Sequence, residues 1–243
     1  MSVVAGLDCD YGVFLAADKQ DTTEDGNTFP VQKLLSVELS NHHLAALGGV
    51  GDDAALVKSA MQKVAQELAK NLADSATGLM ALVDSTRKQF VQSIRSQGRR
   101  IRRDLDDPDF LLAATIGNET MLCQFSLCTP AKRVFLFEAI GHGKHVAGYL
   151  MQKLWREALT QDQTTRLISY SIDQARKRSS LCGCGTDLWL ISASGISKIA
   201  DTKRRGYRDS FKDADCNWRN AILHRDANQS EDTTESDDLS DNA

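Results

Sequence analysis

Ser2 is the residue with the clearest chemical potential, because removal of Met1 would place a free α-amine on the same residue as a hydroxyl. A serine hydroxyl is a weak nucleophile until a base takes its proton. An α-amine titrates near pH 8 and can act as that base, at about cellular pH. A nearby carboxylate and lysine would complete such a site. Asp18 ends the second apolar run of the chain, and Lys33 follows the polar segment after it.

Composition limits the functional classes. The chain has 243 residues, of which 42% are hydrophobic, enough for one large domain with a sizeable core. The formal net charge of -4 gives no general reason to expect nucleic-acid binding. No apolar run approaches the roughly 18 residues needed to span a bilayer. Asp8 and Asp10 interrupt the first apolar stretch, which does not resemble a signal peptide. We therefore expect a cytoplasmic protein with no nucleic-acid or membrane partner.

The cysteines are dispersed along the chain, so we expect reduced thiols and not a disulfide framework. Cys182-Gly183-Cys184 is a single Cys-x-Cys motif. A structural zinc site usually needs two such pairs or histidines at set spacing. We therefore predict neither a metal site nor a cofactor.

Turn-bounded apolar runs predict strands, and three- and four-residue apolar spacing predicts helices. The polar, turn-rich residues 21–30 are expected to form a loop, and Asp52 or Asp53 could cap the first helix. The expected strands are 3–9, 13–18, 34–39, 43–47, 110–116, 120–125, 133–139, 188–193 and 196–199. Four helices are expected. The first begins near residue 52, and the other three span residues around 79–94, 144–158 and 164–179.

These elements follow the order strands, two helices, strands, two helices, strands. Such segregated runs favour an α+β fold of stacked sheets covered by helices. The mixed basic and acidic stretch at 99–109 is expected to be a solvated loop. Residues 1–225 are expected to form one domain. Residues 226–243 are acidic, Ser-rich and poor in apolar residues, which predicts a disordered tail.

Five local motifs follow one another along the chain: Gly12-Val13-Phe14-Leu15-Ala16-Ala17-Asp18-Lys19, Gln32-Lys33-Leu34, Ala45-Ala46-Leu47-Gly48-Gly49-Val50-Gly51-Asp52, Ala139-Ile140-Gly141-His142-Gly143 and Gly183-Cys184-Gly185-Thr186-Asp187. In this order they resemble the proteasome β-type subunits and their bacterial homologues, within the N-terminal-nucleophile (Ntn) hydrolase superfamily. The resemblance covers roughly residues 2 to 202. It implies a four-layer αββα sandwich of two antiparallel sheets flanked by helices.

The resemblance also implies roles for site residues. Ser2 matches the N-terminal nucleophile, Asp18 the acid that orients the lysine, and Lys33 the lysine that lowers the nucleophile's proton affinity. Thr22 and Gly48 match positions whose backbones hold an extended peptide, and the Gly48 amide would form the oxyanion hole. Lys33 would favour a neutral Ser2 amine by charge repulsion, while Asp18 would neutralise Lys33.

Three positions depart from the family pattern. His142 replaces the serine of the Gly-Ser-Gly turn, and Ser179 and Cys182 stand at about the positions of an aspartate and a serine that support the nucleophile. His142 could move protons near the Ser2 amine, or it could be a turn residue at a subunit contact. Cys182 is expected to be a small buried residue and not a second nucleophile.

The first functional hypothesis is a threonine-protease-like endopeptidase that uses Ser2 on polypeptides inside a homo-oligomeric ring, with an ATPase unfoldase as a typical family partner. The alternative is a non-catalytic subunit kept for ring assembly. A third hypothesis is an enzyme that acts on a small amide instead of a protein. The residues that line the substrate pocket would decide between these two substrate classes. By position, the pocket would be lined by Asp21, Val31, Ala46 and Val50, giving a modest pocket tolerant of basic side chains.

Overall fold

The computed structural model describes residues 2–22, 27–38, 44–71, 75–98, 107–117 and 119–223, except for the side chains of 218, 219 and 221–223. The link between the strands expected at 34–39 and 43–47, most of the mixed-charge stretch and the predicted tail at 226–243 lie outside these residues. Within them, the chain is α+β, with three antiparallel sheets and five helices.

The first sheet has the strand order β10-β1-β2-β11-β12, and the second has the order β5-β6-β7-β8-β9. A third, two-stranded sheet pairs β3 with β4. The strands of the first sheet are β1 (Val3–Cys9), β2 (Gly12–Asp18), β10 (Phe137–Gly141), β11 (Thr186–Ser192) and β12 (Gly195–Lys198). Those of the second sheet are β5 (Leu34–Glu38), β6 (Leu44–Val50), β7 (Asp109–Ile116), β8 (Glu119–Ser126) and β9 (Lys132–Val134). The small sheet consists of β3 (Gln20–Thr22) and β4 (Thr28–Pro30).

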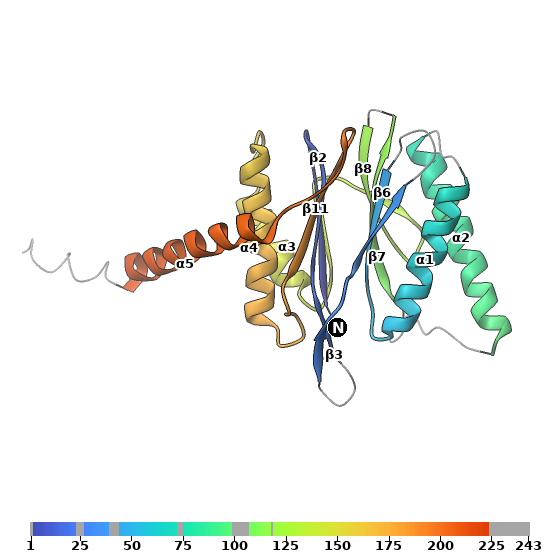
Figure 1. Cartoon of the computed structure of the whole chain (residues 1–243), viewed down its shortest axis with the longest axis horizontal. Helices are drawn as coiled ribbons and strands as arrows, with labels where there is room; N and C mark the ends of the chain where they lie inside the picture. Colours follow the sequence, from blue (N-terminus) through green and yellow to red (C-terminus); the bar gives the residue numbers. More distant parts are fainter. Residues whose placement is uncertain are drawn as a thin grey trace, which may run out of the picture.

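The central strands β2, β6 and β7 are buried along almost their whole length, because both faces of the sheets are covered there, and this explains their nearly continuous apolar sequences. Along β1, Val3 and Ala5 pack into a core with the third and fourth helices, whereas Val4 points into a core shared with the second sheet. Figure 1 shows two helices, α1 (Ala54–Lys70) and α2 (Ala76–Ser96), on the outer face of the second sheet. Two others, α3 (Lys144–Leu154) and α4 (Gln161–Arg178), lie on the outer face of the first sheet.

Three of the helices begin after a residue whose side chain accepts a hydrogen bond from an amide of the first turn. Helix α1 (Ala54–Lys70) starts after Asp53, whose Oδ1 accepts a hydrogen bond from Leu56 N at 2.8 Å, as expected from the sequence. Helix α2 (Ala76–Ser96) starts after Ser75. Helix α4 (Gln161–Arg178) starts with a Thr160–Gln163 capping box. Helix α3 (Lys144–Leu154) ends four residues before its predicted end, because Trp155 turns to an extended conformation.

Two segments differ from the prediction. Residues 21–30, expected to be a loop, contain part of the β3–β4 pair. The single strand expected at 133–139 is two strands, β9 and β10, which belong to different large sheets. The break falls at Leu136, whose φ is 76°, a left-handed conformation that ends a strand.

The helix α5 (Asp201–Leu223) was not predicted, because its charged sequence shows few apolar residues. It packs on α4 through polar and aromatic contacts: Tyr170 Oη donates to Asp215 Oδ1 at 2.8 Å, and the rings of Tyr170 and Phe211 meet edge to face at 4.8 Å. Figure 1 shows its C-terminal half extending away from the sheets and helices.

The burial of Asp8, near the end of β1, is expected to make the stability of the folded protein depend on pH. Burial raises its pKa from 3.8 to about 6, and the positive charge of Arg133 opposes this only in part. Between these pH values the folded state holds more protons than the unfolded state, so Asp8 makes stability fall as pH rises through this window. Asp8→Asn should therefore raise the Tm relative to wild type at pH 7 more than at pH 4. Asp10→Asn, at an exposed turn, is the control. An equal Asp8→Asn effect at both pH values would contradict the argument.

Candidate active site

Asp18, at the end of β2, is fully buried and has hydrogen-bond donors at both carboxylate oxygens. Oδ1 accepts from Val3 N at 2.8 Å and from Lys33 Nζ at 3.0 Å. Oδ2 accepts from Gln20 N at 3.2 Å and from Gly183 N at 3.0 Å. A buried carboxylate is tolerated only when it is paired and hydrogen-bonded in this way.

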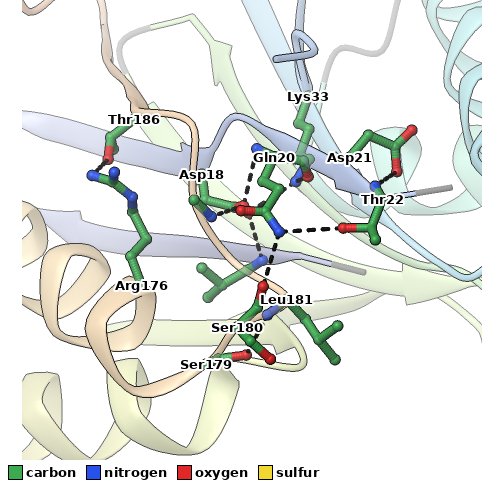
Figure 2. Close-up of polar contacts among 12 residues, drawn as sticks. Asp18, Gln20, Asp21, Thr22, Lys33, Arg176, Ser179, Ser180, Leu181 and Thr186 are labelled. Atoms are coloured by element: carbon green, nitrogen blue, oxygen red, sulfur yellow. Dashed lines mark hydrogen bonds and ion pairs between the residues drawn. The ribbon is translucent and has the colours of Figure 1, made fainter. Parts of the chain in front are cut away.

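Lys33 is 8% exposed and lies just before β5. Besides its ion pair with Asp18, its ammonium donates to the carbonyl oxygen of Gln20. Figure 2 shows Lys33 and Ser180 approaching Asp18 and Gln20 from opposite sides. The structure thus brings together the carboxylate and the lysine that the sequence singled out.

Ser2 is 5% exposed and is held through its backbone on both sides. Its carbonyl oxygen accepts from His142 N at 2.7 Å, and the following amide, Val3 N, donates to Asp18. Gly141 makes this approach possible: its φ is 88°, and a Cβ there would lie 2.2 Å from the Ser2 carbonyl oxygen. The N-terminal segment is therefore fixed to the strand that carries the carboxylate.

Ser2 and Lys33 line one cavity of about 540 Å³. Three of the four residues expected in its specificity pocket, Asp21, Val31 and Val50, also line it. The fourth, Ala46, is buried in the core between the two large sheets. The volume falls in the range of roughly 300–1,000 Å³ that is usual for ligand sites.

Gly48 and Thr22 do not line this cavity, although their neighbours do. Gly48 lies within β6, paired with Leu34 and Leu111, and the adjacent Gly49 forms part of the cavity wall. Thr22 N donates to Asp21 Oδ1 at 3.0 Å. The structure thus places both residues one position away from the cavity lining.

The three positions that depart from the family pattern differ from one another in their burial and in their contacts near this site. His142 is exposed, and its backbone amide donates a hydrogen bond to the Ser2 carbonyl oxygen. Ser179 ends α4, and its Oγ accepts from Leu181 N at 3.3 Å. Cys182 is buried in the core under α4. Burial raises the pKa of the Cys182 thiol, and the negative charge of Asp18 raises it further.

Cys182 should therefore react slowly with thiol reagents, because the thiolate is the reactive form. Iodoacetamide added to the native protein should label the exposed Cys184 and Cys216 first, and label Cys182 only after unfolding. Peptide mass mapping over time measures this order. Labelling of Cys182 at the rate of Cys184 would show that it is an accessible, reactive thiol.

Two contacts of the site were not anticipated from the sequence. Gln20 is buried, and its Nε2 donates to Ser180 O at 2.9 Å and to Thr22 Oγ1 at 3.2 Å. A side chain at Gly183 would force Gln20 to move, because a Cβ there would lie 2.1 Å from Gln20 Oε1. Gly183 belongs to one of the five motifs, but the motif's spacing did not reveal that its amide binds Asp18.

Within the described ranges there is no group of three or more His, Cys, Asp or Glu side chains that could hold a metal ion. None of the helices in those ranges combines the length and apolar character required to cross a membrane.

No family model and no curated protein matches this chain. Solved structures of Anbu do. The Gly-1 mutant of Anbu from Hyphomicrobium sp. strain MC1 aligns with a TM-score of 0.74 and 15% identity, over 92% of this chain and 100% of that chain. Anbu from Yersinia bercovieri, described as an ancestral beta-subunit, gives a TM-score of 0.69 and 14% identity over 88% and 96%. A helical assembly of the Anbu complex from Pseudomonas aeruginosa gives 0.69 and 15% over 87% and 95%.

At these identities the likeness shows the fold alone. The family suggested by the sequence motifs was therefore wrong: the three similar structures given above are named Anbu, one of them as an ancestral beta-subunit, and none is named a proteasome β-type subunit. The motifs misled because they lie in strands and turns that build the shared fold, such as the turn of Gly141 and the strand ending at Asp18. Residues that position a backbone do not distinguish between proteins with the same backbone.

Proposed function

We propose that this chain is an Anbu-like Ntn hydrolase that cleaves peptide bonds, with Ser2 as its nucleophile once Met1 is removed. The observation that carries the proposal is the convergence of three elements. Ser2 and Lys33 face one cavity, and Asp18 binds both Lys33 and the amide that follows Ser2. The two large sheets with helix pairs outside them support assignment to the four-layer αββα sandwich of this superfamily.

In the proposed reaction the free amine of Ser2 takes the proton from its own hydroxyl as Oγ attacks the substrate carbonyl carbon. The amine then gives this proton to the departing amine, which leaves an ester on Ser2. Water hydrolyses the ester in the second half of the reaction. Lys33 disfavours a protonated amine by charge repulsion, and Asp18 holds Lys33 in place. We assign the oxyanion contact to the amide of Gly48, which adjoins the cavity wall.

We further propose that the chain self-assembles and acts on polypeptides. The Anbu complex from Pseudomonas aeruginosa is described as a helical assembly, which supports oligomer formation by a protein of this fold. A closed ring, an ATPase partner and a cytoplasmic location remain predictions from the sequence.

A non-catalytic role in an assembly is the second candidate. It is favoured by one observation: Asp18 and Lys33 have hydrogen-bond partners that would hold the fold together without any chemistry. In that case the ion pair would be needed for stability, and Ser2 would be an ordinary buried residue.

Intact mass and N-terminal sequencing of the natively expressed protein, followed by assays with fluorogenic peptides, test the proposal. We expect a mass without methionine, a free Ser2 and measurable hydrolysis. A retained Met1 or an acetylated Ser2 would block the base and leave the non-catalytic role as the better account.

A further inference from the structure

The cavity beside Ser2 continues along the N-terminal half of α1, beyond the residues expected from the sequence. Its wall is mainly apolar, and its charged members are Asp21, Lys33 and Lys58. The apolar residues of the wall come from β5 and the residue Val31 that precedes it, from the end of β6 and the residue that follows it, and from α1. They are Val31, Leu34, Leu35, Gly49, Val50, Gly51, Ala54, Ala55, Val57 and Met61.

Gly49 brings α1 close to the sheet and thereby shapes this wall. A Cβ at Gly49 would lie 2.8 Å from Val57 Cγ1, 2.9 Å from Met61 Sδ and 2.9 Å from Phe110 Cδ1. Val57 and Met61 are also buried in the core beneath α1, so they cannot swing away from the cavity. The wall formed by these side chains is therefore a fixed apolar surface.

The charged residues of the cavity wall do not favour the binding of a basic substrate side chain. Lys33 is paired with Asp18, and Asp21 Oδ1 already accepts the amide hydrogen of Thr22 (Figure 2). Lys58 is exposed on α1 at the rim. The charges of Lys33 and Asp18 offset one another, so a cationic side chain entering the cavity would find one carboxylate, Asp21, opposed by the Lys58 ammonium. It would also lose hydration against an apolar wall.

We propose that this cavity selects substrates with a large apolar side chain, such as Phe or Leu, on the acyl side of the cleaved bond, and rejects basic ones. Ala54, Val57 and Met61 of α1 set the size of the side chain that fits. The inference rests on the proposed function, since it assigns the substrate class of the same site. It replaces the basic-tolerant pocket expected from Asp21.

Ala54 offers a direct test, because it lines the cavity but is exposed on the first turn of α1. Ala54→Phe should fill the cavity without disturbing the core. Ser59→Phe is the matched control: Ser59 is exposed on the same helix and does not line the cavity. The probes are fluorogenic tetrapeptides that differ only in the residue before the cleaved bond: Phe, Leu, Ala or Arg.

We expect the wild type to cleave the Phe and Leu peptides at least about 10-fold faster in kcat/KM than the Ala and Arg peptides, because each buried methylene discriminates by roughly 10-fold or more. Ala54→Phe should lower kcat/KM for the Phe peptide at least about 10-fold, and more than for the Ala peptide. Ser59→Phe should keep the wild-type ratio. Equal rates for all four peptides, or an Ala54→Phe loss that is the same for all of them, would overturn the inference.

Binding to the Ser2→Ala variant separates this inference from the proposed function. N-acetylated tetrapeptide amides with the same four side chains should bind in the same order by calorimetric titration. If wild type cleaves no peptide but the variant still prefers Phe and Leu, the peptidase proposal fails and the selectivity of the cavity stands. If cleavage occurs without any preference in rate or binding, the selectivity fails and the peptidase proposal stands.

Discussion

Ser2→Ala is expected to reduce peptide hydrolysis by at least about 1,000-fold, because a site that acts through one nucleophile loses its reaction path when the attacking oxygen is removed. The variant keeps the α-amine, the backbone contacts of residue 2 and the Asp18–Lys33 pair. Its free energy of unfolding should change by less than about 1 kcal/mol, as is usual when a single hydroxyl is lost. Initial rates with fluorogenic peptides and urea titrations measure the two effects.

Ser2→Thr is the control for this prediction. It retains the hydroxyl and adds a methyl group that restricts the side-chain rotamer. Activity should therefore persist in Ser2→Thr. Undiminished hydrolysis by Ser2→Ala would eliminate Ser2 as the nucleophile. Loss of folding in that variant would instead mean that the serine is a structural residue.

Asp18→Asn is expected to destabilise the protein by about 3–5 kcal/mol, the usual cost of breaking a buried ion pair. An asparagine amide has one acceptor oxygen, whereas both oxygens of Asp18 accept hydrogen bonds. In one orientation the NH₂ group of the asparagine would face the donors Val3 N and Lys33 Nζ. In the other it would face the donors Gln20 N and Gly183 N, so in both cases two donors lose their acceptor. The Lys33 ammonium would also lose its buried counter-charge. Urea denaturation monitored by tryptophan fluorescence measures the change.

Lys33→Met gives the matched comparison. It removes the charge but leaves Asp18 with its three backbone amide donors. We expect a smaller loss of stability than in Asp18→Asn, together with a loss of hydrolysis. If Asp18→Asn were as stable as wild type, the four contacts of this carboxylate would not hold the site together. If Lys33→Met retained full activity, Lys33 would have only a structural role.

Sequence patterns predicted much of the fold because most elements bury a continuous apolar surface. The strands β1 and β2 are short apolar runs that meet at a turn, and the helices α1 and α2 carry apolar residues at three- and four-residue spacing. Helix α5 could not be predicted in this way, since contacts such as Tyr170–Asp215 hold it by polar groups on a distant helix. The division of 133–139 into two strands was equally hidden, because Leu136 alone gives no sign that its neighbours join different sheets.

In the candidate site too, some features could be predicted from the sequence and others could not. Ser2, Asp18 and Lys33 could be singled out from residue type and position, because the combined hydroxyl and amine, the carboxylate and the lysine have a chemical meaning wherever they meet. Asp18 contacts Lys33 because β4 pairs with β3 and the Val31 amide then donates to Lys19 O, which returns the chain to the end of β2. The roles of Gln20 and Gly183 depend on two hydrogen bonds between segments far apart in the sequence, from Gln20 to Ser180 and from Gly183 to Asp18.

The amino-acid sequence by itself determined the local elements and the chemical groups available for a reaction, since both depend on residue type and short-range periodicity. Only the tertiary structure decided which of these groups meet. It placed Ala46 in the core and drew Val57 and Met61 into the cavity wall. The physical reason is that a cavity is defined by surfaces from several elements, and a side chain faces it only after sheets and helices have packed.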